Sequence, residues 1–346
     1  MSRRRLFEVL LATVLSICLL ALSGVVSAQG NSDNAFERVK EVQERHTEEL
    51  MAKEGVVGTA IGEGQGAQPI VLVLVEHGAV AGIPGQLEGV PVRPLVTGKI
   101  EALQKGGKPG VDLSALTPSS RWPRPVPIGV STGHPAITAG TIGCRVKDGS
   151  GNVYALSNNH VYANQNNAVL GDAVIQPGTY DGGVSHADDI GTLSQFEIIV
   201  FSTTANNVID AAIAQSNLGW LDSATPPDGY GKPKSTTLAA KINIPVKKYG
   251  RTTGLTKGKV YAINATVNVG YSAGNVARFV KQIVITPGTF SAGGDSGSLI
   301  VGDRQGNNTA NDGKPVGLLF AGSNLYTIAN PIDLVLSRFG VTVDGQ

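Results

Sequence analysis

Short stretches rich in valine, isoleucine and threonine, separated by glycine, asparagine and proline, fill the chain from residue 128 to its end. β-Branched residues in runs of this length favour strands, and the residues between the runs favour turns. Of the 346 residues, 45 are glycine and 18 are proline, and only 5% are aromatic. We therefore predict an all-β main domain over residues 128–346, built as two packed β-barrels that meet near residues 219–234.

The start of the chain has a different pattern. Residues 3–5 are arginine, residues 6–26 are mostly apolar, and residues 26–28 are small, which is the order found in an export signal peptide. We expect residues 1–28 to be removed and the protein to be secreted or periplasmic, with no membrane contact in its mature form. The apolar run is also about long enough to span a bilayer of roughly 30 Å. An uncleaved membrane anchor is therefore the alternative.

Residues 29–103 predict a small α+β domain. A helical period extends from residue 34 to residue 54, with Asn34 placed to cap the helix and Gly55 placed to stop it. Three apolar runs of strand length follow, at residues 56–61, 69–75 and 90–100.

Residues 104–127 are rich in glycine and proline, which interrupt both helices and strands. We predict a linker there, exposed enough to be cut. The domain before it is then a pro-region or a regulatory domain.

Charge and metal-ligand patterns exclude several classes of function. Lys+Arg number 28 and Asp+Glu 27, without a long run of one sign, so we expect no nucleic-acid partner. No cofactor motif is present, and the sequence does not indicate an oligomeric state. His46 and His77 lack a second ligand at metal-site spacing, and the stretch 185–189 reads as a solvated loop. We predict no metal site.

Cysteine usage limits how the fold is held together. Export implies an oxidising compartment, yet only Cys144 remains once Cys18 is removed with the signal peptide. No disulfide can then form within the chain. The strand-like residues 139–146 around Cys144 favour a buried, inert thiol over a nucleophile.

Ser296 is the candidate nucleophile. It lies in Gly294-Asp295-Ser296-Gly297, just before an apolar stretch at residues 299–301. Glycines on both sides allow a tight turn that exposes the hydroxyl and directs nearby N–H groups toward one point, as an oxyanion hole requires. We expect the N–H groups of Gly294 and Ser296 to form that hole.

A serine hydroxyl needs a base within hydrogen-bond reach and a third group that orients the base. Of the five histidines, His160 ends an apolar strand in a polar turn and is the natural base. Asp210 is a single carboxylate among the apolar residues 208–214, so it needs a buried partner. Asp188 and Asp189 are the alternative orienting acids.

The order His160, Asp210, Ser296 and the string Gly-Asp-Ser-Gly resemble those of trypsin-like serine peptidases. Residues 249–260 are similar to the hairpin that opens the second barrel in bacterial secreted members such as streptogrisin and α-lytic protease. The resemblance covers residues 128–346 and does not extend to the N-terminal domain. It implies a chymotrypsin-like fold of two six-stranded barrels and an exported serine endopeptidase. Such an enzyme hydrolyses protein or peptide substrates through an acyl-enzyme.

The resemblance also implies a substrate pocket. Phe290, six positions before the serine, would lie at its base, and Ala321, Gly322 and Ser323 would form a second wall. Because position 290 is not acidic, we expect a small or apolar substrate side chain. The chain departs from the family at residues 157–159, where Ser-Asn-Asn replaces the usual small residues before the histidine.

Two other functions stay open. A serine esterase uses the same triad, because the triad alone does not determine the leaving group. A protease-like binding protein would keep the triad but have a malformed pocket or oxyanion hole. Residues 129–133, Gly-Val-Ser-Thr-Gly, match the nucleophile elbow of α/β-hydrolases but lack the strand and helix that this motif requires.

Overall fold

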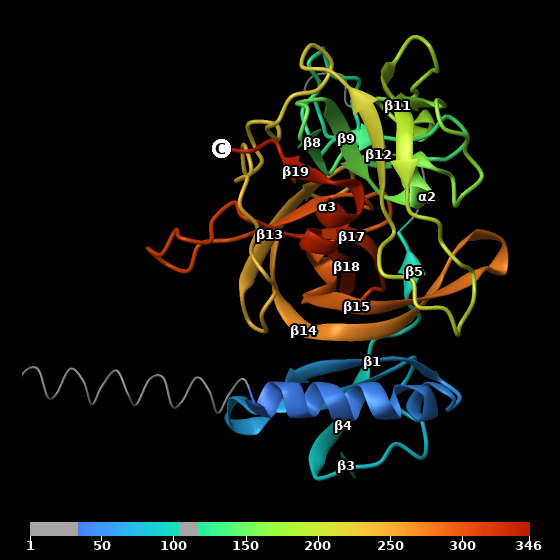
Figure 1. Cartoon of the computed structure of the whole chain (residues 1–346), viewed down its shortest axis with the longest axis vertical. Helices are drawn as coiled ribbons and strands as arrows, with labels where there is room; N and C mark the ends of the chain where they lie inside the picture. Colours follow the sequence, from blue (N-terminus) through green and yellow to red (C-terminus); the bar gives the residue numbers. More distant parts are fainter. Residues whose placement is uncertain (1–33, 104–115) are drawn as a thin grey trace, which may run out of the picture.

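The computed structural model describes residues 34–103 and 116–346. Figure 1 shows a small N-terminal unit, in blue and teal, next to a larger body of strands. The predicted signal peptide, residues 1–28, lies outside the described residues, as does the first half of the predicted linker. In the parts of the chain that the structure describes, no helix is long and apolar enough to cross a membrane.

The second half of the main body is a closed six-stranded barrel. Its strands are β13 (Pro245–Gly250), β14 (Gly254–Gly270), β15 (Val276–Thr286), β16 (Leu299–Gly302), β17 (Pro315–Gly322) and β18 (Thr327–Pro331). They pair in the order β13-β16-β17-β18-β15-β14, and β14 pairs back with β13, which closes the sheet. Its interior is apolar, and Val246, Ile285 and Ile300 are fully buried there.

The first half contains the other six-stranded sheet. Its strands are β8 (Cys144–Asp148), β9 (Val153–Ser157), β10 (Ala173–Ile175), β11 (Asp189–Phe196), β12 (Ala212–Ser216) and β19 (Val341–Val343), in the order β10-β11-β12-β9-β8-β19. This sheet is called the first barrel below, although its end strands β10 and β19 are not paired with each other. β19 comes from the end of the chain, which returns through helix α3 (Ile332–Phe339). Gly340, with a φ of 63°, ends α3 in the left-handed conformation that suits glycine.

Short elements complete the main body. They are β6 (Ser131–Thr132), β7 (Gly140–Thr141), helix α2 (Asn159–Tyr162) and the 3-10 helices η2 (Thr179–Asp181), η3 (Ser272–Gly274) and η4 (Gly288–Phe290). The predicted all-β class, with two six-stranded units, is confirmed.

The N-terminal unit combines one helix with short strands, which confirms the predicted α+β domain. It contains the helix over residues 34–51, β1 (Val56–Glu63), η1 (Gln65–Ala67), β2 (Pro69–Val75), β3 (Gln86–Leu87), β4 (Val90–Val96) and β5 (Glu101–Ala102). The helix ends three residues before the predicted position, and Gly55 then takes a φ of 81° as the chain turns into β1.

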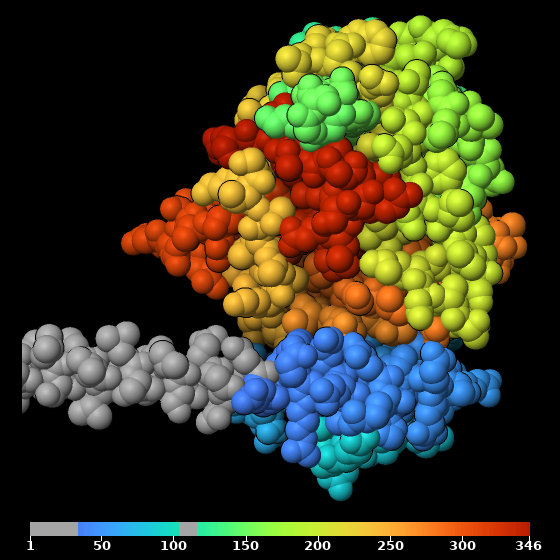
Figure 2. Space-filling view, viewed as in Figure 1, coloured from blue at the N-terminus to red at the C-terminus, as the bar shows by residue number. Residues whose placement is uncertain are grey.

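Strand β2 is buried on both faces. Val71 and Val73 pack beneath the helix, while Leu72 and Leu74 pack against the second barrel. Successive side chains of a strand point to opposite faces, so a strand covered on both sides requires a continuous apolar run. Because β1 pairs with both β2 and β14, the sheet of the unit continues the sheet of the barrel. In Figure 2 the blue unit lies against the orange strands.

Residues 116–127, the second half of the predicted linker, lie on the first barrel. Trp122 packs against its core, and Nε of Arg121 lies 2.7 Å from Oδ1 of Asp188. This half of the stretch is therefore part of the folded body.

Thr141 in β7 connects the first barrel to the loop that carries Ser296. Its N–H donates to the carbonyl oxygen of Ser296 at 2.8 Å. Its hydroxyl donates to the carbonyl oxygen of Gly294 at 2.9 Å and accepts from the N–H of Arg251 at 3.1 Å. The backbone and the side chain of Thr141 therefore both help to position the serine loop relative to the first barrel.

Candidate active site

His160 and Asp210 face each other in the first barrel. Strand β9 ends just before the single turn of α2, which carries His160. Nδ1 of His160 lies 2.6 Å from Oδ2 of Asp210, and the backbone N–H of His160 donates to Oδ1 at 3.2 Å. Only 1% of the His160 side chain and none of the Asp210 side chain is exposed. These two contacts fix the orientation of the imidazole ring and leave Nε2 available for chemistry.

The alternative orienting acids lie elsewhere. Asp188 forms an ion pair with Arg121, and Asp189 accepts a hydrogen bond from the N–H of His186 at 2.8 Å. The side chain of His186 is 93% exposed. The structure therefore places Asp210 beside His160. It places Asp188 and Asp189 beside other residues.

Two asparagines hold the backbone of Asp210. Nδ2 of Asn158 donates to its carbonyl oxygen at 2.7 Å, and Oδ1 of Asn330 accepts its N–H at 3.0 Å. Asn158 belongs to the Ser-Asn-Asn stretch that departs from the family pattern. The side-chain amide of Asn158 links the segment before His160 to the backbone of Asp210.

Tyr271 also contacts the acid, and sequence reasoning missed it. Its hydroxyl donates to Oδ2 of Asp210 at 2.7 Å, and its ring meets the ring of His160 edge-on at 6.0 Å between centroids. Burial, together with the nearby Asp210 carboxylate, raises the pKa of Tyr271 well above its usual value. The phenol therefore stays protonated and acts as a donor to the carboxylate.

The loop around Ser296 contains two left-handed glycines. Gly294 has a φ of 98° and Gly297 a φ of 92°, values that residues with a side chain rarely adopt. An added Cβ at Gly297 would lie 2.1 Å from Oγ of Ser157 in the first barrel. These positions therefore require glycine for both conformation and space.

Asp295 anchors the same loop from within. Its carboxylate accepts the N–H of Thr252 at 2.8 Å and the N–H of Ala292 at 3.0 Å. Nζ of Lys248 lies 3.4 Å from Oδ2, and both side chains are fully buried. Burial lowers the pKa of Lys248, while the charge of Asp295 acts in the opposite direction. Sequence reasoning missed this pair, since residues 47 positions apart show no local pattern.

The Ser296 hydroxyl contacts the N-terminal unit. It is 3.1 Å from the carbonyl oxygen of Leu103 and 3.2 Å from that of Phe320. The N–H of Gly294 donates to the same Leu103 oxygen at 2.8 Å. Within residues 34–103 and 116–346, Nε2 of His160 has no hydrogen-bond partner, and the N–H of Ser296 makes no hydrogen bond to the Leu103 oxygen.

The four predicted pocket residues surround this contact. Phe290 is buried in η4, in the apolar cluster against which Leu103 packs. Ala321 and Gly322 in β17 pair with β5 of the N-terminal unit. Ser323 lines an open cleft of about 780 Å³ that also includes Leu103 and the loop before Ser296.

Other nucleophile candidates have structural roles. Cys144 is buried in β8, and burial raises the pKa of its thiol far above its usual value, as expected of an inert cysteine. The hydroxyl of Ser131, in the string that matches a nucleophile elbow, donates to Oδ2 of Asp181 at 2.5 Å. Among the described residues, no group of three or more histidine, cysteine or acidic side chains is arranged to hold a metal ion.

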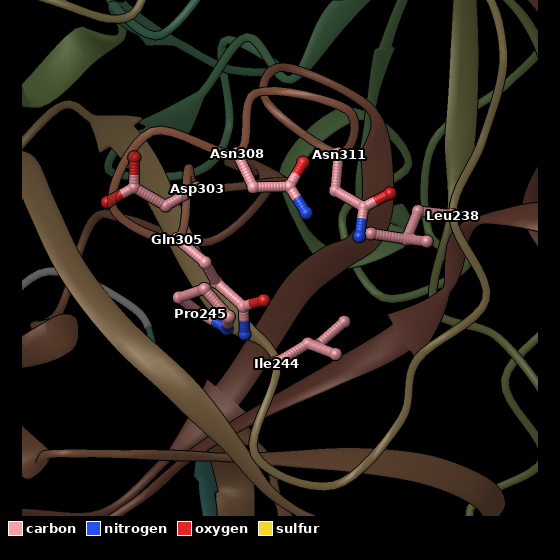
Figure 3. A pocket seen from close by; sticks show the side chains of 7 residues that line it. All are labelled: Leu238, Ile244, Pro245, Asp303, Gln305, Asn308 and Asn311. Carbon is pink, nitrogen blue, oxygen red and sulfur yellow. The ribbon is translucent and has the colours of Figure 1, made fainter.

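A second hollow lies beside β13 and the loop after β16 (Figure 3). Its cavity is only about 10 Å³, room for roughly one water molecule. Asp303 at its edge is already paired with Lys247 at 3.2 Å and with Lys257 at 2.9 Å. The cavity is therefore too small for a substrate, and the charge of Asp303 at its edge is already neutralised.

Comparisons with known proteins give a partial match in sequence. No family model matches the chain. Serine protease 1 of Streptomyces fradiae is 30% identical over 166 residues, which are 47% of this chain and 40% of that protein. The chain resembles the trypsin-like serine peptidases. The resemblance that the motifs predict is thus confirmed, and the chain spans only 40% of the relative's length.

Solved structures give weaker likenesses. A glutamic acid-specific serine protease, described as using a histidine triad in substrate binding, has a TM-score of 0.45 at 22% identity. The match covers 63% of this chain and 100% of that one. Protease A of Thermobifida fusca has a TM-score of 0.42 at 16% identity, over 64% of this chain and 100% of that one.

Proposed function

We propose that this chain is an exported serine endopeptidase in which His160, Asp210 and Ser296 form the catalytic triad. The observation that carries the proposal is the carbonyl group of Leu103. Its oxygen accepts hydrogen bonds from the Ser296 hydroxyl and from the N–H of Gly294. A nucleophile and a fixed N–H donor on one peptide carbonyl are what acyl transfer requires.

The mechanism follows from the contacts of each group. Oγ of Ser296 attacks the carbonyl carbon of the substrate while Nε2 of His160 takes its proton. Asp210 holds the ring through Nδ1 and stabilises the imidazolium that forms. His160 then gives the proton to the leaving amine, and water hydrolyses the acyl-enzyme to release the acid and restore the serine.

Peptides fit the cleft better than small esters do. β17 presents its edge to an extended segment, and β5 pairs with it as an added antiparallel strand. A substrate that adds a strand gains main-chain hydrogen bonds, which a small ester lacks. This observation favours a peptidase over the esterase and supports protein or peptide substrates.

Export and domain organisation complete the proposal. Residues 1–28 direct secretion, and residues 29–103 act as a pro-region or regulatory domain that residues 104–127 connect to the peptidase domain at residues 128–346. The support for a regulatory role is that the end of this domain lies in the substrate cleft.

The test is digestion of casein, an unstructured protein, by the purified chain and by Ser296→Ala, with fluorophosphonate labelling of both. We expect the wild-type chain to cleave casein and take up the label, and both signals to disappear in Ser296→Ala. Labelling of the wild type without digestion of casein would favour an esterase or an uncleaved precursor. If the folded protein gives neither signal with and without the N-terminal unit, the peptidase proposal is wrong and a binding protein is favoured.

A further inference from the structure

The segment that leads to Asp210 lies on the second barrel. β15 pairs with β18 over residues 283–285, and Asn207 lies along β15 just before this pairing begins. The N–H of Asn207 donates to the carbonyl oxygen of Arg278 at 3.2 Å, and its own carbonyl oxygen accepts the N–H of Val280 at 2.9 Å. The acid of the triad is therefore approached by a segment that the second barrel holds.

The guanidinium of Arg278 holds the loop before this segment. It donates to the carbonyl oxygens of Thr204 and Ala205 at 2.7 Å each, and to Oδ1 of Asn206 at 2.9 Å. Only 4% of Arg278 is exposed. These contacts and the bridge at residue 207 all precede Asp210, so the order of residues 208–210 depends on other groups.

Gln282 provides such a group because β15 contains a bulge. β15 advances three residues, from Phe279 to Gln282, where its partner β14 advances only two. Lys281 lies in this bulge with a φ of 65°, and it is exposed. A bulge changes the direction of the side chains beside it. Here it leaves the lysine outside and Gln282 fully buried.

The amide of Gln282 is connected to Asp210 in two steps. Its Nε2 donates to the carbonyl oxygen of Val208 at 2.8 Å and to that of Val280. Its Oε1 accepts from Nδ2 of Asn330 at 2.7 Å, and Oδ1 of Asn330 accepts the N–H of Asp210 at 3.0 Å. Both amide side chains are fully buried. One continuous network thus joins the second barrel to residues 208 and 210.

A structural role explains only part of this network. Burying an amide costs free energy unless its polar groups are bonded, and an apolar side chain of the same size would fill the space without that cost. The ladder between β15 and β18 does not need the amides, since it consists of main-chain pairs at residues 283–285. The two amides instead bind the main chain of the segment that ends at Asp210.

We propose that Gln282 is a positioning residue for the triad. Through Asn330 it fixes the main chain of Asp210, and thereby the 2.6 Å contact between Oδ2 of Asp210 and Nδ1 of His160. Small displacements of a catalytic group lower the rate strongly, so the acid orients the ring only while its own main chain is fixed. The proposal rests on the peptidase function above.

The kinetic test is Gln282→Met, which keeps the length of the side chain and removes its amide. We expect kcat to fall by about tenfold, as for the loss of one or two hydrogen bonds. KM should not change, because neither Gln282 nor Asn330 lines the cleft. The acidic limb of the kcat/KM profile should move to lower pH, since a carboxylate that is held less closely favours the imidazolium less. In the described part of the chain, the titratable side chains in contact with His160 are Asp210 and Tyr271.

A second measurement does not need activity. Hydrogen exchange of the Asp210 amide, followed by NMR, should be about tenfold faster in Gln282→Met, because the acceptor of this amide, Asn330, has lost its own partner. The amide of Ile300, in the apolar interior of the same barrel, is the reference that corrects for a change in overall stability.

The matched control is Gln43→Met. Only 1% of Gln43 is exposed, and its amide donates to Thr59 and Asn264, where the N-terminal unit meets the second barrel. This variant should lower stability without moving the acidic limb of the kcat/KM profile. It should also leave the exchange of the Asp210 amide unchanged relative to that of Ile300. Equal effects of the two methionine variants on these measurements would overturn the proposal.

A second variant keeps the proposal testable if Gln282→Met does not fold. Gln282→Asn retains a polar amide but is one methylene too short to reach both Val208 and Asn330. We expect the acidic limb and the exchange of the Asp210 amide to change in the same directions. A folded variant in which neither changes rejects the proposal.

Failure of this proposal is distinguishable from failure of the peptidase function. If the wild type digests casein, and folded Gln282→Met keeps the wild-type pH profile and the wild-type exchange of the Asp210 amide, the proposed function holds and this inference is rejected. If the wild type gives neither digestion nor labelling, the peptidase function is rejected. The exchange of the Asp210 amide then still decides whether Gln282 fixes the main chain of Asp210.

Discussion

Tyr271 reaches Asp210 from the second barrel, so one hydroxyl connects the two halves of the molecule at the acid. With His160, it is the second side chain that contacts Oδ2 of Asp210. Its donated hydrogen bond spreads the charge of the carboxylate and limits how strongly that charge favours the imidazolium. Tyr271 is thus a positioning residue whose effect reaches the reaction through Asp210.

Tyr271→Phe should lower kcat by roughly tenfold, since a hydrogen bond to a charged group contributes about 1.5–3 kcal/mol and other contacts to Asp210 remain. It should also move the acidic limb of the kcat/KM profile to higher pH, because the unshared carboxylate favours the imidazolium more. The matched control is Tyr162→Phe, another buried tyrosine, which does not contact Asp210. Identical pH profiles for Tyr271→Phe and the wild type would contradict this role.

Lys248 provides the charge that balances Asp295 beneath the serine loop. Lys248→Met should destabilise the protein by about 3–5 kcal/mol, because it leaves a buried carboxylate without its charge partner. Urea denaturation measures the loss. The neighbouring Lys247→Met is the control, since Lys247 pairs with more exposed acids and should cost much less. An equal loss of unfolding free energy in the two variants would contradict a larger contribution from the buried pair Lys248–Asp295.

Sequence patterns predict residues that carry their own local signal. Gly294 and Gly297 flank Ser296 and His160 follows a strand, so local patterns indicate both as candidates, and the structure places Asp210 beside His160. The contacts of Tyr271 with Asp210 and of Lys248 with Asp295 join residues about 50 to 60 positions apart. Local patterns cannot indicate such contacts.

A substitution in strand β7, which pairs with β6 in a separate two-stranded sheet, tests how this strand positions the serine loop. Thr141→Val keeps the shape of the side chain but removes the hydrogen bonds to Gly294 and Arg251. We expect kcat to fall by roughly tenfold, because each lost hydrogen bond is worth about 1 kcal/mol and Gly294 is the proposed oxyanion donor. Steady-state kinetics on a peptide p-nitroanilide measure this effect.

The control lies in the paired strand. Thr132→Val in β6 is equally buried, and its hydroxyl donates to Ile175 rather than to the serine loop. It should lower stability without a comparable loss of kcat. A similar kcat for both valine variants would indicate that Thr141 acts only on folding.

Arg45 and His46 of the helix over residues 34–51 form hydrogen bonds with Glu88 in the β3–β4 turn. Hydrogen bonds that His46 donates to Glu88 and then to Glu49 raise the pKa of His46, and hydrogen bonds from Arg45 and then His46 hold the pKa of Glu88 at about 2. His46 is a base whose pKa is raised in the folded state. Its contribution to the stability of the folded state is therefore complete below the unfolded pKa of about 6.5, and it is lost as pH rises through the folded pKa.

Hydrogen exchange should therefore speed up in this helix between pH 6 and pH 8, after correction for the intrinsic pH dependence of exchange. The His46→Gln variant should show no such change, while Glu88 stays ionised in both. If hydrogen exchange in the helix of His46→Gln sped up between pH 6 and pH 8 as it does in the wild type, this explanation would be rejected.

At the element level, apolar runs predicted the N-terminal helix and the strands around it. They did not predict β5, because Glu101-Ala102 has no alternation and pairs with residues more than 200 positions away. They also did not predict that β19, the last strand, returns to the first barrel, since its pairing with β8 depends on the whole fold.

On the scale of the whole molecule, the N-terminal unit and the main body share a sheet, an apolar core and the cleft that Ser323 lines. The sequence predicts two units with a linker, because composition changes at residues 104–127. It contains no sign that the first unit ends at Ser296, since this placement depends on β1 pairing with β14. We therefore expect the active site and the N-terminal unit to respond together to changes at their boundary.

The central claim is that His160 activates Ser296, and mapping a fluorophosphonate label by peptide mass spectrometry tests it most directly. We predict that the wild-type chain and His186→Ala carry the label on Ser296, and that His160→Ala is labelled at least about 10³-fold more slowly. Label on any other serine, or equal labelling rates in His160→Ala and His186→Ala, would contradict the assignment of the triad.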